Sequence, residues 1–197
     1  MAAWKQKRRH VRYYNRVAPT YDVLYQEEQR LKIDVALRHV ELPPRSCILD
    51  LGCGTGLLAL SKIGEKARMM IGLDVSKGML NLSNPSVRST SVHLVLADAD
   101  HTPLRRGCFD GVFAITLLQN MPNPLETLRE IRQLAKLDAP IVVTGLKKRF
   151  TPDSFRQLLE SAKLEAKLVA TDEKVKCHIA LCTRRRSRGP SRGALHS

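Results

Sequence analysis

Residues 48–56 constrain the fold more than any other stretch, because they join an apolar run to three alternating glycines. They read Ile-Leu-Asp-Leu-Gly-Cys-Gly-Thr-Gly and pass directly into a second apolar run. A buried parallel strand reads as a short apolar run, and glycine permits close approaches that a Cβ forbids. The segment therefore predicts a strand, a tight turn and a helix start, whose free N–H groups favour a carboxylate or phosphate.

The glycine spacing separates classes of nucleotide ligand. The pattern is G-x-G-x-G, and Leu57 stands where the dinucleotide-binding pattern G-x-G-x-x-G has its third glycine. The chain has no G-x-x-x-x-G-K-[ST] pattern, and the glycine turn holds no lysine. These differences argue against NAD and against a nucleotide held by its phosphates.

Two further apolar runs, 69–74 and 92–98, each end in a carboxylate. Ligands of open α/β sheets lie across the carboxyl ends of the strands, so we expect Asp50, Asp74 and Asp98 to converge on one crevice. Asp74 is the candidate acceptor for both ribose hydroxyls, and Asp98 for the exocyclic amine of adenine. Asp50 either contacts the ligand or supports the glycine turn by accepting N–H bonds. An unphosphorylated adenosine attached to a group with a free carboxylate is S-adenosylmethionine.

These segments resemble the motifs of the class I S-adenosylmethionine-dependent methyltransferases, and the resemblance covers about residues 11–182. Residues 49–56 look like that family's first motif, 72–76 like its second and 97–99 like its third. The resemblance implies a doubly wound α/β fold with a mostly parallel seven-stranded sheet. Its last strand is expected to run antiparallel between strands five and six.

Within that family, residues 14–22 and 118–124 are similar to the ubiquinone/menaquinone methyltransferase branch. The same scaffold hosts many acceptors, so the branch is a weak guide to substrate. Thr116 to Asn120 follow the fourth strand, where the family normally lines its acceptor pocket. The tetrapeptide [DN]-P-P-[YFW] is absent there, which disfavours methylation of adenine N6 or of a glutamine side chain.

The resemblance implies S-adenosyl-L-methionine as cofactor, but it assigns no catalytic residue and no metal ligand. Candidate cofactor-binding residues are Tyr21, Asp50, Gly52, Cys53, Gly54, Gly56, Asp74, Val75, Asp98, Ala99 and Thr116.

Other conspicuous side chains have two interpretations each. Tyr13, Tyr14 and Tyr21 either close over the cofactor as a lid or anchor the leading helix. His101 is either a base near the adenine or a solvated loop histidine. Residues 177 and 178, Cys-His, point to opposite faces of a strand, which favours ordinary packing over metal binding.

Periodicity and capping signals predict alternating helices and strands. The expected helices and strands beyond those named above are helices over 20–40, 56–67, 76–82, 124–136 and 151–163, strands over 111–116 and 141–144, and a hairpin of 166–171 with 174–182.

The expected organisation is a basic N-terminal segment (1–19), one methyltransferase domain (20–182) and a basic, disordered tail (183–197). An apolar fraction of 43% is ordinary for a globular protein, and five cysteines without C-x-x-C spacing predict neither disulfides nor zinc. The first residues lack the apolar core of a signal peptide, and no apolar run is long enough to span a bilayer. We therefore expect a cytoplasmic protein.

The net charge of +14 is concentrated at the two ends of the chain and in a central cluster. Tails of one sign suit a polyanion, although they also serve solubility. The charge favours RNA (tRNA or rRNA) or a ribosome-associated target as methyl acceptor; the alternatives are a small or isoprenoid quinone-type acceptor, and a non-catalytic scaffold. The cationic residues are Lys5, Lys7, Arg8, Arg9, Arg12 and Arg16, then Lys147, Lys148 and Arg149, and finally Arg184, Arg185, Arg186, Arg188 and Arg192.

Residues 91–97 form the expected third strand, which the family's strand order places at a sheet edge. This strand is more apolar than a free edge usually is, and such an edge invites strand addition from another chain. In some RNA- and translation-factor-modifying relatives, a small activator subunit pairs with this edge. The alternative is that residues 84–90 of the chain itself cover it.

Overall fold

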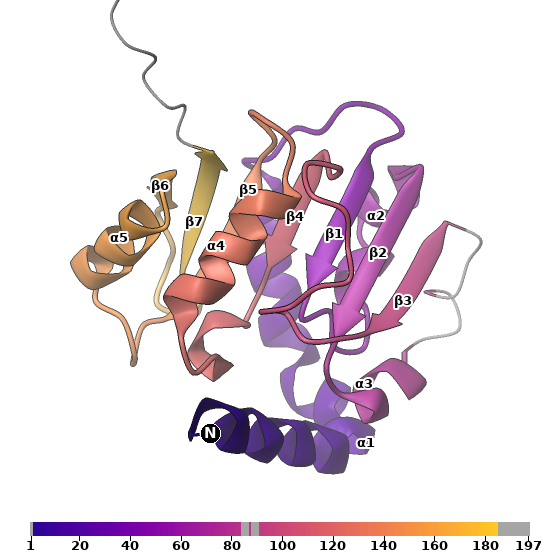
Figure 1. Cartoon of the computed structure of the whole chain (residues 1–197). Coiled ribbons are helices and arrows are strands. Elements are labelled where there is room, and N and C mark those ends of the chain that lie inside the picture. The colour runs from indigo at the N-terminus through magenta and orange to yellow at the C-terminus, as the bar shows by residue number, and fades with distance from the viewer. Residues whose placement is uncertain (1, 84–86, 88–90, 185–197) are drawn as a thin grey trace, which may run out of the picture.

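The computed structural model describes residues 2–83, 87 and 91–184. At its centre lies a seven-stranded sheet in the order β3-β2-β1-β4-β5-β7-β6 (Figure 1). Neighbouring strands from β3 to β5 are parallel, whereas β7 is antiparallel to both β5 and β6. The predicted doubly wound α/β fold with an antiparallel last strand is confirmed.

The sequence predictions located most elements within a few residues. The strands are β1 (Cys47–Leu51), β2 (Met69–Asp74), β3 (Val92–Leu96), β4 (Gly111–Ala114), β5 (Ile141–Leu146), β6 (Leu164–Val169) and β7 (Cys177–Arg184). The helices are α1 (Ala2–Leu37), α2 (Lys62–Lys66), α3 (Lys77–Asn81), α4 (Pro124–Leu134) and α5 (Pro152–Ser161), with 3-10 turns η1 (Leu57–Leu60) and η3 (Leu118–Asn120).

The sheet is covered on both faces, which explains its nearly continuous apolar strands. The side chains of α4 and α5 pack with alternate strand residues such as Leu49 into one core. The C-terminal half of α1 packs with the opposite strand residues, including Ile48, into a second core. Figure 1 shows α4 and α5 in front of the sheet and this half of α1 behind it. The strands are thus held from both sides, and their carboxyl ends meet at one edge.

Helix α1 begins at Ala2 and not at residue 20, so the predicted start is wrong. Residues assigned to a separate basic segment form one helix with residues 20–37, and Pro19 lies inside it. A proline removes one helical hydrogen bond and bends the axis. Figure 1 shows the N-terminal half passing below the carboxyl ends of the strands, while the later part rises along the sheet. Of the predicted basic tail, only residues 183 and 184 are described, and they belong to β7.

The predicted helix over 56–67 is also wrong, because the chain divides into η1 and α2 around Ser61. Ser61 has an extended backbone, with φ −88° and ψ 166°. A Cβ on Gly64 would lie 2.2 Å from the Ala59 carbonyl oxygen, so the chain folds back more tightly than a continuous helix does. Two other predicted helix starts are confirmed: Ser76 caps α3, and Thr151 forms a capping box with Ser154 at α5.

In the described ranges, no helix is both long and apolar enough to cross a membrane.

Candidate active site

The three carboxylates at the strand ends face one cavity, as the sequence predicted. The empty space at this cavity, open solvent included, is about 1020 Å³. All the candidate cofactor-binding residues except Gly56 line it, together with Lys7 of the predicted basic cluster and residues that the sequence did not single out, including His10 and Gln29. The N-terminal half of α1 contributes Lys7, His10 and Tyr14, so this half forms part of the cavity wall.

The glycine turn has the geometry that its spacing predicted. Gly52, Gly54 and Gly56 have φ values of 78°, 56° and 87°. Residues other than glycine rarely adopt this backbone conformation. A Cβ on Gly52 would lie 3.0 Å from Leu117, and one on Gly56 would lie 2.8 Å from Val87. A Cβ on Gly54 would meet nothing within 4 Å. Gly56 therefore shapes the turn away from the cavity, whereas Gly54 leaves room for a ligand against the backbone.

Asp74 supports the glycine turn as well as facing the cavity. Its Oδ2 accepts a hydrogen bond from the Gly54 N–H at 2.9 Å, and its Oδ1 accepts one from the Ser76 N–H at 2.8 Å. Burial raises the pKa of Asp74, and these backbone hydrogen bonds only partly offset that rise. A carboxylate has about four lone-pair sites, so the backbone hydrogen bonds of Ser76, Gly54 and Val75 leave capacity for a ligand hydroxyl.

Asp50 does not take the loop-supporting role that the sequence left open. The N–H groups of Gly52 and Cys53 donate to the Leu73 carbonyl, and that of Gly54 donates to Asp74. Asp50 is buried at the cavity wall, and burial together with the charge of Asp74 raises its pKa to about 7. This carboxyl is therefore partly protonated near neutral pH, and a nearby cation would favour its ionised form.

Asp98 lies in the cavity wall, and its carboxylate is already paired with a lysine of the chain itself. Lys7 Nζ lies 2.6 Å from Asp98 Oδ1 and 2.5 Å from Asp100 Oδ2, with its side chain only 11% exposed. Lys7 was predicted as part of an RNA-binding cluster, and the structure instead places it inside the protein. Its only signal in the sequence was its charge, which does not identify a partner about ninety positions away.

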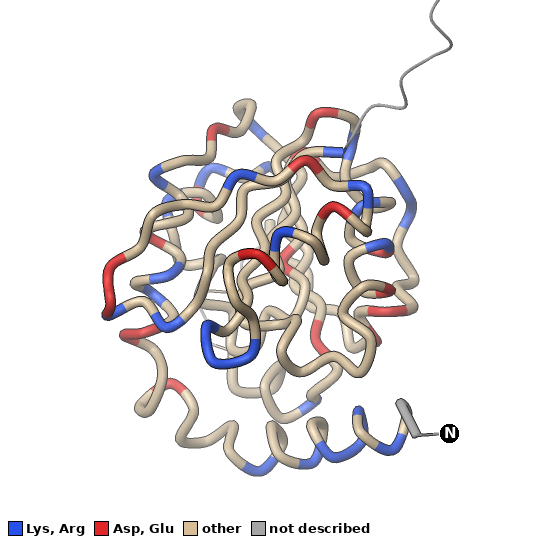
Figure 2. The backbone as a smooth tube through the Cα atoms, turned by 90° about the vertical axis from the view of Figure 1, so that its left-hand side faces the viewer, with Lys and Arg blue, Asp and Glu red and all other residues tan. Residues whose placement is uncertain are grey.

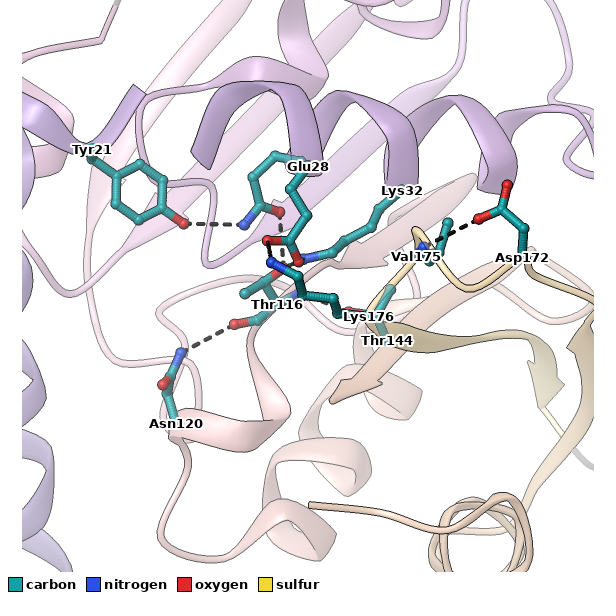
Figure 3. A network of polar contacts seen from close by, with 10 residues as sticks. Tyr21, Glu28, Lys32, Thr116, Asn120, Thr144, Asp172, Val175 and Lys176 are labelled. Atoms are coloured by element: carbon teal, nitrogen blue, oxygen red, sulfur yellow. Dashed lines mark hydrogen bonds and ion pairs between the residues drawn. The ribbon is translucent and has the colours of Figure 1, made fainter. Parts of the chain in front are cut away.

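A second polar network joins α1 to the end of β4. Thr116 has φ 62°, which is strained for a β-branched residue, and its N–H donates to Thr144 Oγ1 at 2.7 Å. Figure 3 shows Tyr21, Glu28 and Lys32 reaching from α1 toward Thr116. Lys32 is 2% exposed and its ammonium lies 2.9 Å from Glu28. A buried lysine between apolar residues gave no functional signal in the sequence.

The predicted lid tyrosines differ in their positions. Tyr14 and Tyr21 line the cavity, and the Tyr14 hydroxyl accepts a hydrogen bond from Asn120 Nδ2 at 2.9 Å. Tyr13 is 41% exposed and contacts the ring of Tyr14 from outside. His101 is exposed and lies beside a second, shallower hollow and not in the cavity that holds the glycine turn.

Exposed cations lie on two segments close to the cavity. They lie on the outer side of the N-terminal half of α1 and in the loop after β5, and Figure 2 shows Lys and Arg recurring along this half of the helix. His10, in the cavity wall, has a pKa lowered by burial and by the charge of Arg149, so the loop and the helix approach each other here. We call this surface the basic rim; it comprises Lys5, Arg8, Arg9, Arg12, Arg16, Lys148 and Arg149.

The cavity fits the cofactor that the sequence predicted. Gly54 leaves open a backbone cradle that any Cβ would narrow, Asp74 keeps unused lone pairs, and two ionisable carboxyls face a ligand that carries a sulfonium and an ammonium. Among the described residues that line the site, no group of cations is arranged for a phosphate chain, and Lys7 is already paired with two carboxylates.

Comparison with known proteins finds likeness to methyltransferases. A family model described as a methyltransferase domain matches residues 49–143. The chain is 30% identical over 139 residues to a demethylmenaquinone methyltransferase of Lactiplantibacillus plantarum, covering 66% of this chain and 59% of that protein. It is 26% identical over 114 residues to a tRNA U34 carboxymethyltransferase of Pseudoalteromonas atlantica, covering 55% of this chain and 34% of that protein.

A solved structure shares the fold. It is a complex between the Haloferax volcanii Trm112 methyltransferase activator and a candidate methyltransferase, matched with a TM-score of 0.76 and 14% identity over 88% of this chain and 98% of that chain. The chain spans about half the length of the curated relatives it matches.

Proposed function

We propose that this chain carries a class I S-adenosylmethionine-dependent methyltransferase domain, and that it transfers the methyl group of that cofactor to RNA (tRNA or rRNA) or to a ribosome-associated target. The observation that carries methyl transfer is the convergence of Asp50, Asp74 and Asp98 with the glycine turn on one cavity. The acceptor class rests on the basic rim, which lies close to that cavity.

In this proposal each part of the cavity has a binding task. Gly52, Cys53 and Gly54 bring backbone against the cofactor, Asp74 and Val75 hold its ribose, and Asp98 and Ala99 bound its adenine. Asp50 lies where a cationic group of the cofactor is favoured, and Gly56 sets the shape of the turn. Tyr21 and Thr116 contact the amino-acid end of the cofactor.

The chemistry requires alignment more than a protein nucleophile. The bound cofactor supplies a methyl group on a positively charged sulfur, which an acceptor atom displaces in line. The contribution of this chain is to orient the acceptor and to exclude water, and the N-terminal half of α1 is placed to do so because it walls the cavity. In this proposal the basic rim binds the RNA phosphates, while Lys7, on the cavity side of the same helix, stays paired with its carboxylates.

The acceptor is tested by the salt dependence of RNA binding. Replacing Arg8, Arg9, Arg12 and Arg16 by Gln removes cations of the basic rim and leaves Lys7 in place. Each lost phosphate contact lowers the slope of log K against log salt by about 0.7 to 0.9, so the slope is expected to fall by about 2 to 4. Filter binding of total tRNA across a salt series measures this.

The matched control removes the same amount of charge near the amino ends of the strands, on the side away from the cavity. The control variant carries Gln at four exposed positions that precede strands: Lys62, Lys66, Arg105 and Arg106. Its slope of log K against log salt is expected to stay within about one unit of the wild-type slope. Equal slopes for the two variants would contradict an RNA acceptor. Full turnover of a quinone-type or small acceptor without RNA binding would establish the alternative, which the likeness to a demethylmenaquinone methyltransferase favours.

We also propose an activator subunit at β3, which lies at a sheet edge. The backbone groups of residues 91 and 97 bond to β2, so those of residues 92, 94 and 96 face outward. Leu96 is 55% exposed beside them. The alternative cover, residues 84–90, lies outside the described residues except for Val87. The likeness to a chain from a complex with an activator supports the proposal.

Leu96→Pro tests this partner, because proline removes an outward N–H and is tolerated at sheet edges. Co-purification of a small activator from the same cells is expected with the wild type and with Leu96→Ala, and to be lost with Leu96→Pro. Retention by all three proteins would contradict pairing at this edge.

A further inference from the structure

A chain of hydrogen bonds runs from a buried ammonium to a tyrosine in the cavity (Figure 3). Lys32 Nζ donates to Thr116 Oγ1 at 3.2 Å, and Thr116 Oγ1 donates to Gln29 Oε1 at 2.8 Å. Gln29 Nε2 donates in turn to the Tyr21 hydroxyl at 3.2 Å. Lys32 and Gln29 are both buried, so water does not compete for these groups.

The ammonium fixes the direction of the first bond in this chain, and the later bonds run in the same sense. A lysine ammonium has donors only, so Thr116 Oγ1 must accept from Lys32. The hydroxyl hydrogen of Thr116 is then free for Gln29 Oε1, and this places the amide NH₂ of Gln29 toward Tyr21. The Tyr21 oxygen accepts there and keeps its own hydrogen. Within the described residues, no acceptor for that hydrogen is in reach.

The ammonium of Lys32 is paired with a carboxylate that also meets a second lysine. Glu28 lies 2.9 Å from Lys32 and 3.3 Å from Lys176. Burial alone would raise the pKa of Glu28, but the hydrogen bonds and charges of the two lysines outweigh it and lower that pKa. Thr144 and Asn120 fix the backbone of Thr116 at the same time, so the hydroxyl that receives the ammonium hydrogen bond cannot move away.

Tyr21 is a donor and not a base. Burial raises its pKa well above the ordinary value, and the nearby Tyr14 and Asp74 raise it further. The phenol therefore stays protonated at neutral pH. Tyr21 lines the cavity, and its neighbour Asp22 accepts a hydrogen bond from Thr55 of the glycine turn at 2.7 Å. The Tyr21 hydroxyl thus shares the cavity wall with the glycine turn, and a ligand carboxylate there can accept its hydrogen.

We propose that Gln29 and Lys32 are positioning residues that hold the Tyr21 hydroxyl as a hydrogen-bond donor to the amino-acid carboxylate of the bound cofactor. The inference rests on the proposed function, because it assumes that this cavity takes S-adenosylmethionine. It adds to that function a reason for burying a lysine in α1. The lysine sets the polarity of a hydrogen-bond chain that ends on the ligand.

The first experiment compares two ligands by calorimetry: S-adenosylhomocysteine, and its analogue in which hydrogen replaces the α-carboxylate. Tyr21→Phe removes one oxygen and keeps the ring. It is expected to weaken binding of S-adenosylhomocysteine about tenfold, the range of a hydrogen bond to a charged group, and to change binding of the analogue less than twofold. Weakening of both ligands equally, or of neither, would overturn the assignment of the carboxylate.

The second experiment reverses the hydrogen-bond chain. Gln29→Glu places an acceptor opposite Tyr21, so the phenol hydrogen turns away from the ligand. This variant is expected to match the tenfold loss of Tyr21→Phe, and the double variant to lose no more than either single change. A mere repulsion between Glu and the ligand carboxylate would persist in the Phe background, and additive losses would therefore overturn the inference.

Two further proteins keep the test decisive. Gln26→Glu makes the same charge change one turn earlier in α1 and is expected to alter binding less than twofold. Should Gln29→Glu fail to fold by circular dichroism, Gln29→Met removes the donor to Tyr21 without adding charge. A loss of about threefold, for S-adenosylhomocysteine only, supports the chain, and no loss overturns it. A wild type that binds neither ligand overturns the proposed function instead.

Discussion

In α1, residues 20–37 and residues 2–18 are held by different kinds of contact. The C-terminal half packs buried residues such as Ile33 and Ala36 against the sheet. The N-terminal half lies over the strand ends and is joined to them mainly by polar contacts. Lys7 pairs with Asp98 and Asp100, and Asn15 Oδ1 accepts hydrogen bonds from Ser76 and Gly78 at 2.8 Å.

The difference indicates separate tasks for the two halves. Apolar packing is insensitive to a ligand beneath it, whereas ion pairs and hydrogen bonds at the cavity exchange readily with the groups of a ligand. Gly78 permits the close approach, because a Cβ there would lie 2.9 Å from the Asn15 backbone. We infer that the C-terminal half stabilises the fold and that the N-terminal half responds to what the cavity holds.

The largest expected effect is on the C-terminal half. Ile33→Ala removes buried methyl groups from the second core and is expected to lower the free energy of unfolding by about 2 to 5 kcal/mol. Urea denaturation measures the loss. The control is Val23→Ala on the same helix, where the side chain is 88% exposed and the expected change is within about 0.5 kcal/mol. Similar losses of unfolding free energy at both positions would contradict a stabilising role for the packed face of α1.

A second prediction concerns Asp50, in the cavity that both halves line. Its raised pKa means that, between the ordinary value of 3.8 and about 7, the native state holds a proton that the unfolded chain has released. The free energy of unfolding therefore falls as pH rises through this window. Asp50→Asn lacks this dependence. Between pH 4 and pH 8 its free energy of unfolding is expected to rise, relative to that of the wild type, by at most about 4 kcal/mol. Denaturation across that range checks it, and parallel curves would contradict the burial of this carboxyl.

The smallest effect on global stability is expected for the N-terminal half. Lys7→Met breaks a largely buried pair with two carboxylates and is expected to lower the free energy of unfolding by about 1 to 3 kcal/mol. Amide hydrogen exchange in residues 2–18 is expected to rise about tenfold, while that of residues 24–37 stays unchanged. Lys5→Met, at an exposed neighbour, is the control. A uniform rise along α1 would show that the two halves open together.

The outcomes for individual site residues separate local from distant causes. The glycine turn, the carboxylates that end three strands and the cap at Ser76 follow from short patterns, and all lie where those patterns predicted. The long reach of α1, its ion pair at Asp98 and the buried Lys32 were not predicted. Each depends on a partner far along the chain, and a charge in the sequence carries no information on which distant carboxylate it meets.

The sequence by itself determined the fold class, the cofactor crevice and the order of the elements, because hydrophobic period and glycine geometry act over a few residues and permit few alternatives. Only the tertiary structure decided the path of α1 across the strand ends, the split between η1 and α2, and the direction of the hydrogen bonds from Lys32 to Tyr21. These features depend on which groups meet after the chain has folded. Burial then fixes their protonation and their hydrogen-bond direction, which no local pattern records.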